Sequence, residues 1–275
     1  MTRVRQGLLL IDNSAYSRLA DPDAMRRLKS NMRAAWLDPA ASEVNLLEAS
    51  ATTPPAVEAA LVATIYEFAG DWPLLAWPFA LLRRIGQALV DDIANLRTGE
   101  SGKEWYLEDA AARHELRAEI AAFNKNLERH YAELHAKTRP KSQQWLKARR
   151  VKRSIGELRT FLDEEWPTLD LRNFIAEITW ASFGLPGEAP VKDLLDVPAW
   201  RILLDIEGAA LFARALVHEQ PKLVQRSDLI QLVYLGASGV RLLAAADGPF
   251  LSMARQIING RYAGARVLHI DELLQ

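Results

Sequence analysis

The chain has 275 residues, with 34 Lys and Arg against 35 Asp and Glu, and it contains no cysteine. A chain of this length can form one large domain or two ordinary ones, and its mixture of apolar and charged residues is typical of a globular protein. The missing cysteines exclude a disulfide scaffold, a zinc ribbon and a thiol nucleophile, and the net charge of −1 argues against a uniformly basic nucleic-acid-binding coat.

Three short apolar runs predict strands of a buried parallel sheet, because they are continuous and do not alternate with polar residues. They cover residues 8–11, 240–244 and 266–270. Between the second and third runs, apolar residues recur on one helical face over 249–259. The C-terminal end therefore predicts strand, helix, strand.

The middle of the chain, from Pro55 to about Gln220, is predicted to be helical. The apolar periodicity and the Pro and Gly breaks favour helices over 56–68, 107–134, 154–162, 173–183 and 200–217. A parallel sheet must join strands from both ends of the chain. We therefore expect a small α/β core, residues 7–60 and 220–272, split by a helical insertion or covering subdomain, residues 61–219.

No apolar stretch of the sequence predicts a membrane span. The run over 8–11 is too short for a signal-peptide apolar region, and the longest apolar window, 72–82, contains two prolines and ends at Arg83. A span needs about 20 apolar residues. We expect a cytoplasmic protein without a membrane partner.

Acidic residues at strand ends are the first candidates for chemistry, because ligands of open α/β sheets bind beyond the carboxyl ends of the strands. Asp12 ends the first apolar run and Asp247 follows the second. Glu48 and Asp228 are expected near helix starts, Glu48 after the turn-like sequence at 38–40. Four converging carboxylates would suit a hard cation such as Mg²⁺ or Mn²⁺. Helix caps and turn residues are the alternative reading of each acid alone.

These acids lie in sequence contexts that resemble the PIN-domain ribonuclease family. LLLIDNSAY at 8–16 resembles the opening strand, first metal-binding Asp and small hydroxyl residue of that family, and SEVNLLE at 42–48 resembles its second signature. SDLIQLVYL at 227–235 and VRLLAAADGPF at 240–250 resemble the third and the last.

The resemblance implies a Mg²⁺- or Mn²⁺-dependent endoribonuclease in which Asp12, Glu48, Asp228 and Asp247 bind the metal. Ser14 would then lie beside the metal or position a phosphate oxygen. Hydrolysis would leave 5′-phosphate and 3′-hydroxyl ends. Such a chain belongs to the α/β class.

Two departures from the family pattern motivate an alternative. Ala245 stands two residues before the final Asp, where many members carry Ser or Thr, and the stretch between the second and third acids is much longer than in the small toxin-type members. A PIN-like scaffold with weak or no catalysis, whose helical insertion contacts a protein partner, is the second hypothesis. An all-helical interaction protein is the third, and measurable strand content would exclude it.

A basic stretch in the middle of the chain is the candidate RNA-binding surface. Its nucleic-acid-binding residues would be Lys147, Arg149, Arg150, Lys152 and Arg153, with Trp145 as a stacking platform. The alternative is a solvated helix face.

Two further polar features have structural interpretations. Asp205 and Glu207 interrupt the otherwise apolar helix over 200–217, which predicts a core-facing ion pair, or a residue supporting the metal site. His269 is expected to be a structural residue rather than a base.

Overall fold

The computed structural model describes residues 7–50, 54–70, 74–91, 155–215, 226–237 and 239–275, together with residues 133, 136–137, 139–141 and 143–144. The strands in this part of the chain form a single four-stranded parallel sheet in the order β2-β1-β3-β4. They are β1 (Gly7–Ile11), β2 (Leu37–Ala40), β3 (Val240–Ala245) and β4 (Arg266–His269). The sheet excludes the all-helical hypothesis.

The three strands predicted from apolar runs are present, but the fourth was missed. The segment at 38–40 was expected to be a turn, yet it belongs to β2, where Pro39 lies beside Leu9 of β1. The prediction of a turn was wrong because a proline occurs both in turns and in edge strands. β2 is an edge strand of the sheet, and an edge strand tolerates a residue that cannot donate to the ladder.

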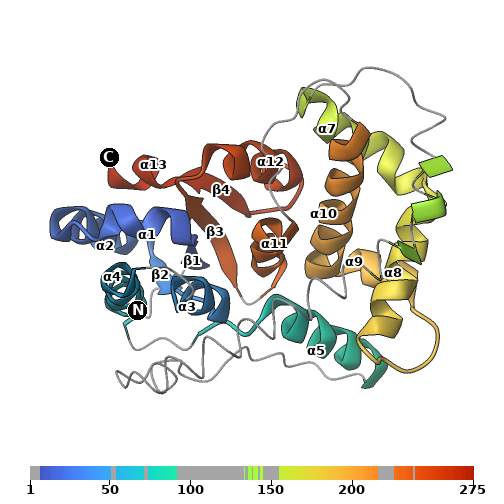
Figure 1. The fold of residues 1–275 in the computed structure, drawn as a ribbon, viewed down its shortest axis with the longest axis horizontal. Coiled ribbons are helices and arrows are strands. Elements are labelled where there is room, and N and C mark those ends of the chain that lie inside the picture. The colour runs from blue at the N-terminus through green and yellow to red at the C-terminus, as the bar shows by residue number, and fades with distance from the viewer. Residues whose placement is uncertain are drawn as a thin grey trace.

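Helices lie on both faces of this sheet (Figure 1). Leu9 and Ile11 face one side and pack against helices α1, α2 and α4, whereas Leu10 faces the other. The helices on the first side are α1 (Asn13–Leu19), α2 (Pro22–Ala35), α3 (Glu43–Ser50), α4 (Pro55–Ala69) and the C-terminal α13 (Ile270–Leu274). Leu46 and Ala49 of α3 belong to this layer, while its Val44 joins the opposite one.

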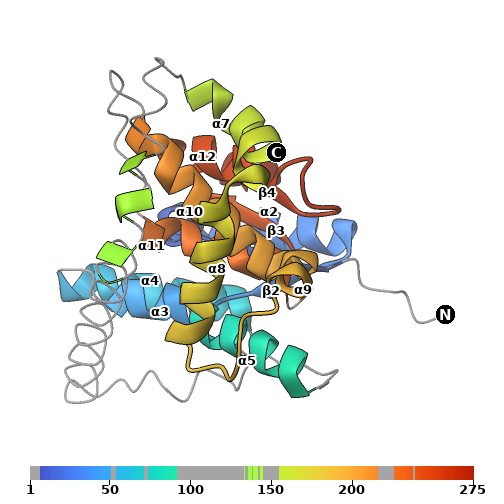
Figure 2. The ribbon, with the colours of Figure 1, turned by 90° about the vertical axis from the view of Figure 1, so that its right-hand side faces the viewer.

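Helices from the middle of the chain share their hydrophobic core with the second face of the sheet. Leu10 and Leu243 of the sheet belong to the same buried cluster as Trp166, Trp180 and Trp200. The longer helices of this side are α5 (Pro78–Asp91), α8 (Asp170–Ser182), α9 (Val191–Asp196), α10 (Pro198–Ala215) and α12 (Gly248–Ile258). Figures 1 and 2 both place α8 on the side of α10 that faces away from the sheet.

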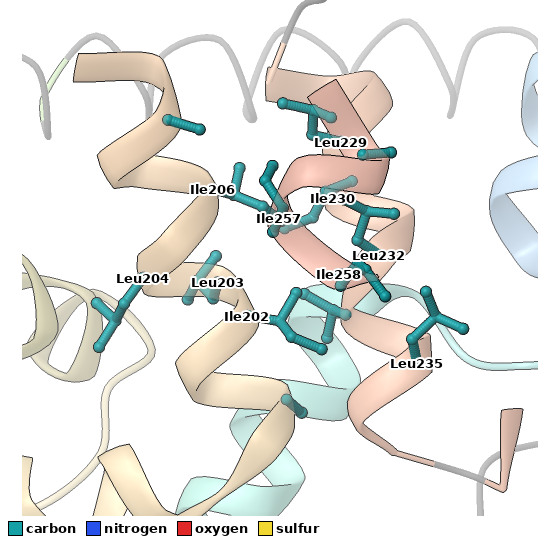
Figure 3. Close-up of a cluster of buried hydrophobic side chains, with 14 of the residues drawn as sticks. Ile202, Leu203, Leu204, Ile206, Leu229, Ile230, Leu232, Leu235, Ile257 and Ile258 are labelled. Carbon is teal, nitrogen blue, oxygen red and sulfur yellow. The ribbon is translucent and has the colours of Figure 1, made fainter. Parts of the chain in front are cut away.

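Shorter helical segments complete the described chain. Residues 155–168 form successive short turns of helix that include α7 (Leu158–Thr160) and a π-helical turn, Phe161–Glu165. Helix α11 (Arg226–Leu229) continues as a 3₁₀ segment, Ile230–Gly236. This segment lies between α10 and β3 and carries Leu232 and Leu235 into the core (Figure 3).

Figure 3 shows how α10 joins the helical layer to the core. Ile202 and Ile206 of α10 lie in the same buried cluster as Ile230 of the 3₁₀ segment and Ile257 of α12. All four side chains are at most 1% exposed. Burying a side chain of this size contributes about 1.5–3 kcal/mol, so this cluster fixes α10 to the 3₁₀ segment and to α12.

Most of the other predicted helices agree with the structure. Helices are present where 56–68, 173–183, 200–217 and 249–259 predicted them, apart from residues 216–217, which are not described, and the predicted segment 154–162 is helical from residue 155. The helix expected over 107–134 lies outside the described residues except for residue 133. No described helix is long and apolar enough to cross a bilayer.

Candidate functional site at the carboxyl edge of the sheet

The chain reverses its direction of winding between the two central strands. From β1 it proceeds to β2 on one side, whereas the later strands β3 and β4 lie on the other side of β1. In open α/β sheets this switch point leaves a crevice outside the carboxyl ends of the strands, where ligands bind. Asp12 follows β1 directly and Asp247 follows β3, so both acids lie at the carboxyl edge of the sheet beside the switch point.

The carboxylate of Asp12 is held in place by three donors. Its Oδ2 accepts from the backbone N–H of Ser14 at 2.9 Å and from the Ser14 hydroxyl, so Asp12 caps helix α1. Its Oδ1 accepts from Nε2 of Gln231 at 3.0 Å, from across the site. The alternative reading of this acid as a helix cap is therefore confirmed, and Asp12 still reaches solvent in part.

Ser14 joins the ends of the two central strands. While its hydroxyl donates to Asp12, its Oγ accepts from the backbone N–H groups of Ala246 at 2.9 Å and Asp247 at 3.3 Å. Asp247 in turn caps α12, its Oδ1 accepting from the Phe250 N–H at 2.7 Å. The Ser14 hydroxyl of α1 thus positions the backbone at Asp247. It lies near Ala245, whose side chain has no hydroxyl group.

Two asparagines connect the site to α3. The side chain of Asn45 is fully buried, and its Nδ2 donates to the carbonyl of Ile11 at 3.0 Å, while its Oδ1 accepts from the backbone N–H of Ser42 at 2.9 Å. Asn13 donates through Nδ2 to the Asn45 carbonyl at 3.1 Å and to Oε2 of Glu48 at 2.8 Å. Glu48 lies on α3 well past its first turn, and not at the helix start that the sequence suggested.

The negative charge of two other acids contributes to a raised pKa of Glu48. Its pKa is raised to about 8 by loss of solvation, and also by the carboxylates of Asp12 and Asp228, while the hydrogen bond from Asn13 lowers it. The Glu48 side chain reaches solvent, which limits its loss of solvation, so the two neighbouring carboxylates are an important cause of the raised pKa. Asp228 is itself exposed, in the first turn of α11. Three acids from three separate segments therefore interact at this edge.

Replacing Glu48 by Gln should change how stability depends on pH. The pKa of Glu48 rises from about 4.5 in the unfolded chain to about 8 in the folded one. Within this range the folded state binds more protons, so the stability of the wild type falls as pH rises from 4.5 towards 8. Glu48→Gln removes this dependence, so its urea midpoint relative to wild type should be higher at pH 8 than at pH 5.

The matched control for this titration is Glu67→Gln. Glu67 lies on α4 with its side chain 62% exposed and pairs with Lys29 at 3.5 Å. Its replacement should leave the pH dependence of wild type in place. Parallel stability curves for wild type and Glu48→Gln between pH 5 and pH 8 would contradict the coupling of Glu48 to its acidic neighbours.

The oxygen-rich composition of the site suits a hard cation, although the side chains are not arranged around one. Among the residues that the structure describes, no group of three or more acidic or histidine side chains is placed to hold a metal ion. Their oxygens instead accept from the amides of Asn13 and Gln231. Gln231 is 1% exposed and its Oε1 is buried without a hydrogen-bond partner in the structure.

That unpartnered oxygen is consistent with a cation or water beside Asp12. Leaving a buried polar atom unpaired costs about 1–3 kcal/mol, so the arrangement is more stable with a donor or cation there. The Tyr16 hydroxyl is a second buried polar atom without a hydrogen-bond partner in the structure, and burial, together with the Asp12 carboxylate, raises its pKa. The donor set, made of carboxylate and amide oxygens, fits Mg²⁺ or Mn²⁺.

The other candidate residues either lie outside the described part of the chain or have structural roles. The basic stretch, with Trp145, Lys147, Arg149, Arg150, Lys152 and Arg153, lies outside the described residues. Asp205 pairs with Arg261 at 2.7 Å in the core, which confirms the predicted ion pair. His269 caps α13, its Nδ1 accepting from the Asp271 N–H, so it has the structural role expected.

Sequence reasoning missed the amides of Asn13, Asn45 and Gln231. Asn13 and Asn45 stand inside the first and second acidic motifs, and Gln231 follows Asp228 by three residues, one helical turn further on. Their positions close to the acids in the sequence were the signal that could have identified them.

Comparison of the chain with protein-family models, curated proteins and solved structures finds no match. The functional argument therefore depends on the geometry of the site.

Proposed function

We propose that this protein is a Mg²⁺- or Mn²⁺-dependent endoribonuclease of the PIN type. The observation that carries the proposal is geometric: Asp12 follows a central strand at the switch point of the parallel sheet, and the adjacent Asn13 donates to Glu48 at 2.8 Å. The carboxylates of Asp12 and Asp228 also raise the pKa of Glu48, which supports the same grouping. Asp247 lies at the same edge through the Ser14 bridge. The motif order of the resemblance supports the same set of four acids. A cytoplasmic location is part of this proposal.

In this proposal the four acids would hold the cation, and hydrogen bonds position Asp12, Glu48 and Asp247 for that role. Ser14 and Gln231 orient the two oxygens of Asp12, and Asn13 orients Glu48. When bound, the ion supplies positive charge that polarises the phosphodiester and favours ionisation of an attacking water. Ser14 would position a phosphate oxygen by turning its hydroxyl proton away from Asp12.

The reaction is hydrolysis of a phosphodiester. The water oxygen forms a bond to phosphorus while the bond from phosphorus to the 3′ oxygen breaks. The leaving oxygen takes a proton and becomes a 3′-hydroxyl, and the phosphate remains on the 5′ side. RNA is the proposed substrate, and the basic stretch with Lys147, Arg149, Arg150, Lys152, Arg153 and Trp145 is its proposed contact surface.

Manganese binding and RNA cleavage test the proposal together. We expect the full chain to bind Mn²⁺ with millimolar or tighter affinity in a calorimetric titration and to cleave a fluorogenic single-stranded RNA only with Mg²⁺ or Mn²⁺. Glu48→Gln should abolish both, and Glu67→Gln should change neither. Cleavage that persists in excess chelator would contradict the metal-dependent reaction.

A non-catalytic PIN-like scaffold is the second candidate. The observation that favours it is that no three acids in the described part of the chain are arranged around an ion. On this hypothesis the helical insertion contacts a protein partner. Mn²⁺ binding without RNA cleavage, or no binding at all, would favour the scaffold over the nuclease.

A further inference from the structure

One buried amide at the acidic edge has hydrogen-bonding capacity that the fold does not use. Gln231 lies in the 3₁₀ segment and is 1% exposed. Its Nε2 donates to Oδ1 of Asp12 at 3.0 Å, so the amide is directed into the site. Its Oε1 is buried and has no hydrogen-bond partner in the structure. Because an unpaired buried oxygen is costly, a ligand that engages it would stabilise this side chain.

The acids of this edge need a further oxygen donor to surround an ion. Within the described chain, no group of three or more acidic or histidine side chains is placed to hold one. An amide oxygen is a hard donor of the same kind as a carboxylate oxygen, and both suit Mg²⁺ and Mn²⁺. Among the described residues, Gln231 supplies the side-chain amide that is bonded to Asp12.

The two ends of the Gln231 amide can exchange places. The NH₂ group and the oxygen are similar in size, and rotation about the last side-chain bond is soft. The exchange breaks one hydrogen bond, from Nε2 to Asp12, because Oε1 has none to lose. Oε1 would then take the place from which Nε2 now contacts Oδ1 of Asp12 at 3.0 Å.

That spacing matches the distance between neighbouring ligands of a small hard cation. With metal–oxygen bonds of about 2.0–2.1 Å, adjacent oxygens of an octahedral Mg²⁺ site lie about 2.9 Å apart. After the exchange, Oε1 of Gln231 and Oδ1 of Asp12 would be separated by nearly the same distance. The two oxygens can therefore bind one cation side by side.

The amide of Asn13 lacks this freedom. Its Nδ2 donates to the Asn45 carbonyl at 3.1 Å as well as to Glu48 at 2.8 Å, and its Oδ1 accepts from Nδ2 of Asn45 at 3.3 Å. Turning this amide would break all three hydrogen bonds. Asn13 therefore holds Glu48 in place, and Gln231 is the amide that can change its role.

We propose that Gln231 is a neutral ligand of the cation site, with its Oε1 and Oδ1 of Asp12 binding the ion together. Without an ion, the N–H group of Gln231 takes the ion's place beside the Asp12 carboxylate. This inference rests on the proposed function, from which it takes the cation, and it adds an amide oxygen to the four acids.

Replacing Gln231 by Met and by Glu tests this role in the full chain. Gln231→Met removes both the N–H donor and the oxygen, so it should weaken Mn²⁺ binding at least about tenfold in a calorimetric titration. Gln231→Glu removes the donor but keeps the oxygen, so it should bind Mn²⁺ at least as tightly as wild type at neutral pH. Without an ion its new carboxylate repels Asp12, so Mg²⁺ should raise its thermal unfolding midpoint more than that of wild type.

Gln256 provides the matched control. It is another glutamine whose Oε1 is buried without a hydrogen-bond partner in the structure, but its Nε2 donates to the Ser252 carbonyl at 3.4 Å, within α12. Gln256→Met and Gln256→Glu should bind Mn²⁺ as wild type does. Thermal unfolding in excess chelator identifies any variant that does not fold. If Gln231→Met is such a variant, the comparison of Gln231→Glu with Gln256→Glu decides.

The possible failures of the inference and of the proposed function are distinguishable. Gln231→Met that binds Mn²⁺ as tightly as wild type would exclude Gln231 as a ligand and leave the four acids as the proposed site. Weakened binding in Gln231→Glu would show that Gln231 acts on Asp12 through its N–H group, and would also overturn the inference. Absence of Mn²⁺ binding in the wild type would overturn the inference and the proposed function together.

Discussion

Asp12→Asn should reduce RNA cleavage at least about 10³-fold while the protein remains folded. A metal centre contributes several kcal/mol of transition-state stabilisation, and each 1.36 kcal/mol corresponds to a factor of ten in rate. Asparagine has the same shape as aspartate and is an equally good helix cap, so α1 keeps its capping interaction. The loss would therefore come from the missing charge. Single-turnover cleavage with Mn²⁺ measures the rate, and far-ultraviolet circular dichroism checks the fold.

Asp21→Asn is the control for this change. Asp21 caps α2 through its side chain, which accepts from the Asp23 N–H at 3.0 Å, as Asp12 caps α1. The two variants lose the same charge from the same type of position, and they differ in that only Asp12 lies at the switch point. Asp21→Asn should cleave like wild type. Equal activity of the two variants would contradict a catalytic role for Asp12.

The sheet could be predicted from the sequence because its central strands are strongly apolar. The central strands β1 and β3 are mostly buried, and most of their residues are apolar. The edge strand β4 keeps only the short apolar pair Val267 and Leu268. Strand β2 has no such run, since Asp38 and Pro39 occupy half of it. Its pairing with β1 is a property of the folded sheet that local sequence does not encode.

The acids of the candidate site could be predicted from the sequence, but the hydrogen bonds that connect them could not. Asp12 and Asp247 were recognisable because Asp12 directly follows one apolar run and Asp247 stands a few residues after another. The bridge from Ser14 to the end of β3 spans more than two hundred residues of sequence, and so does the bond from Gln231 to Asp12. Contacts at that separation depend on strand order, which periodicity does not determine.

The partner of Asp205 in its buried ion pair could not be predicted from the sequence for the same reason. Two acids on an apolar helix indicated a buried pair, but its partner, Arg261, lies in the turn after α12 and could not be identified from spacing. The structure also shows Tyr262 donating to the same carboxylate oxygen. Asp205 therefore connects α10 with the chain that leads into β4.

Arg261→Met should destabilise the protein by about 3–5 kcal/mol, because it leaves the carboxylate of Asp205 buried without its cation. The two side chains are only 4% and 1% exposed. Arg26→Met is the control, since Arg26 pairs with Asp23 on the surface, where both side chains are at least 67% exposed and such pairs contribute about 0–1 kcal/mol. Urea unfolding followed by circular dichroism measures both variants. A loss below about 1 kcal/mol in Arg261→Met would show that solvent, or the Tyr262 hydroxyl alone, is enough to stabilise Asp205, and that the helical layer does not depend on this pair.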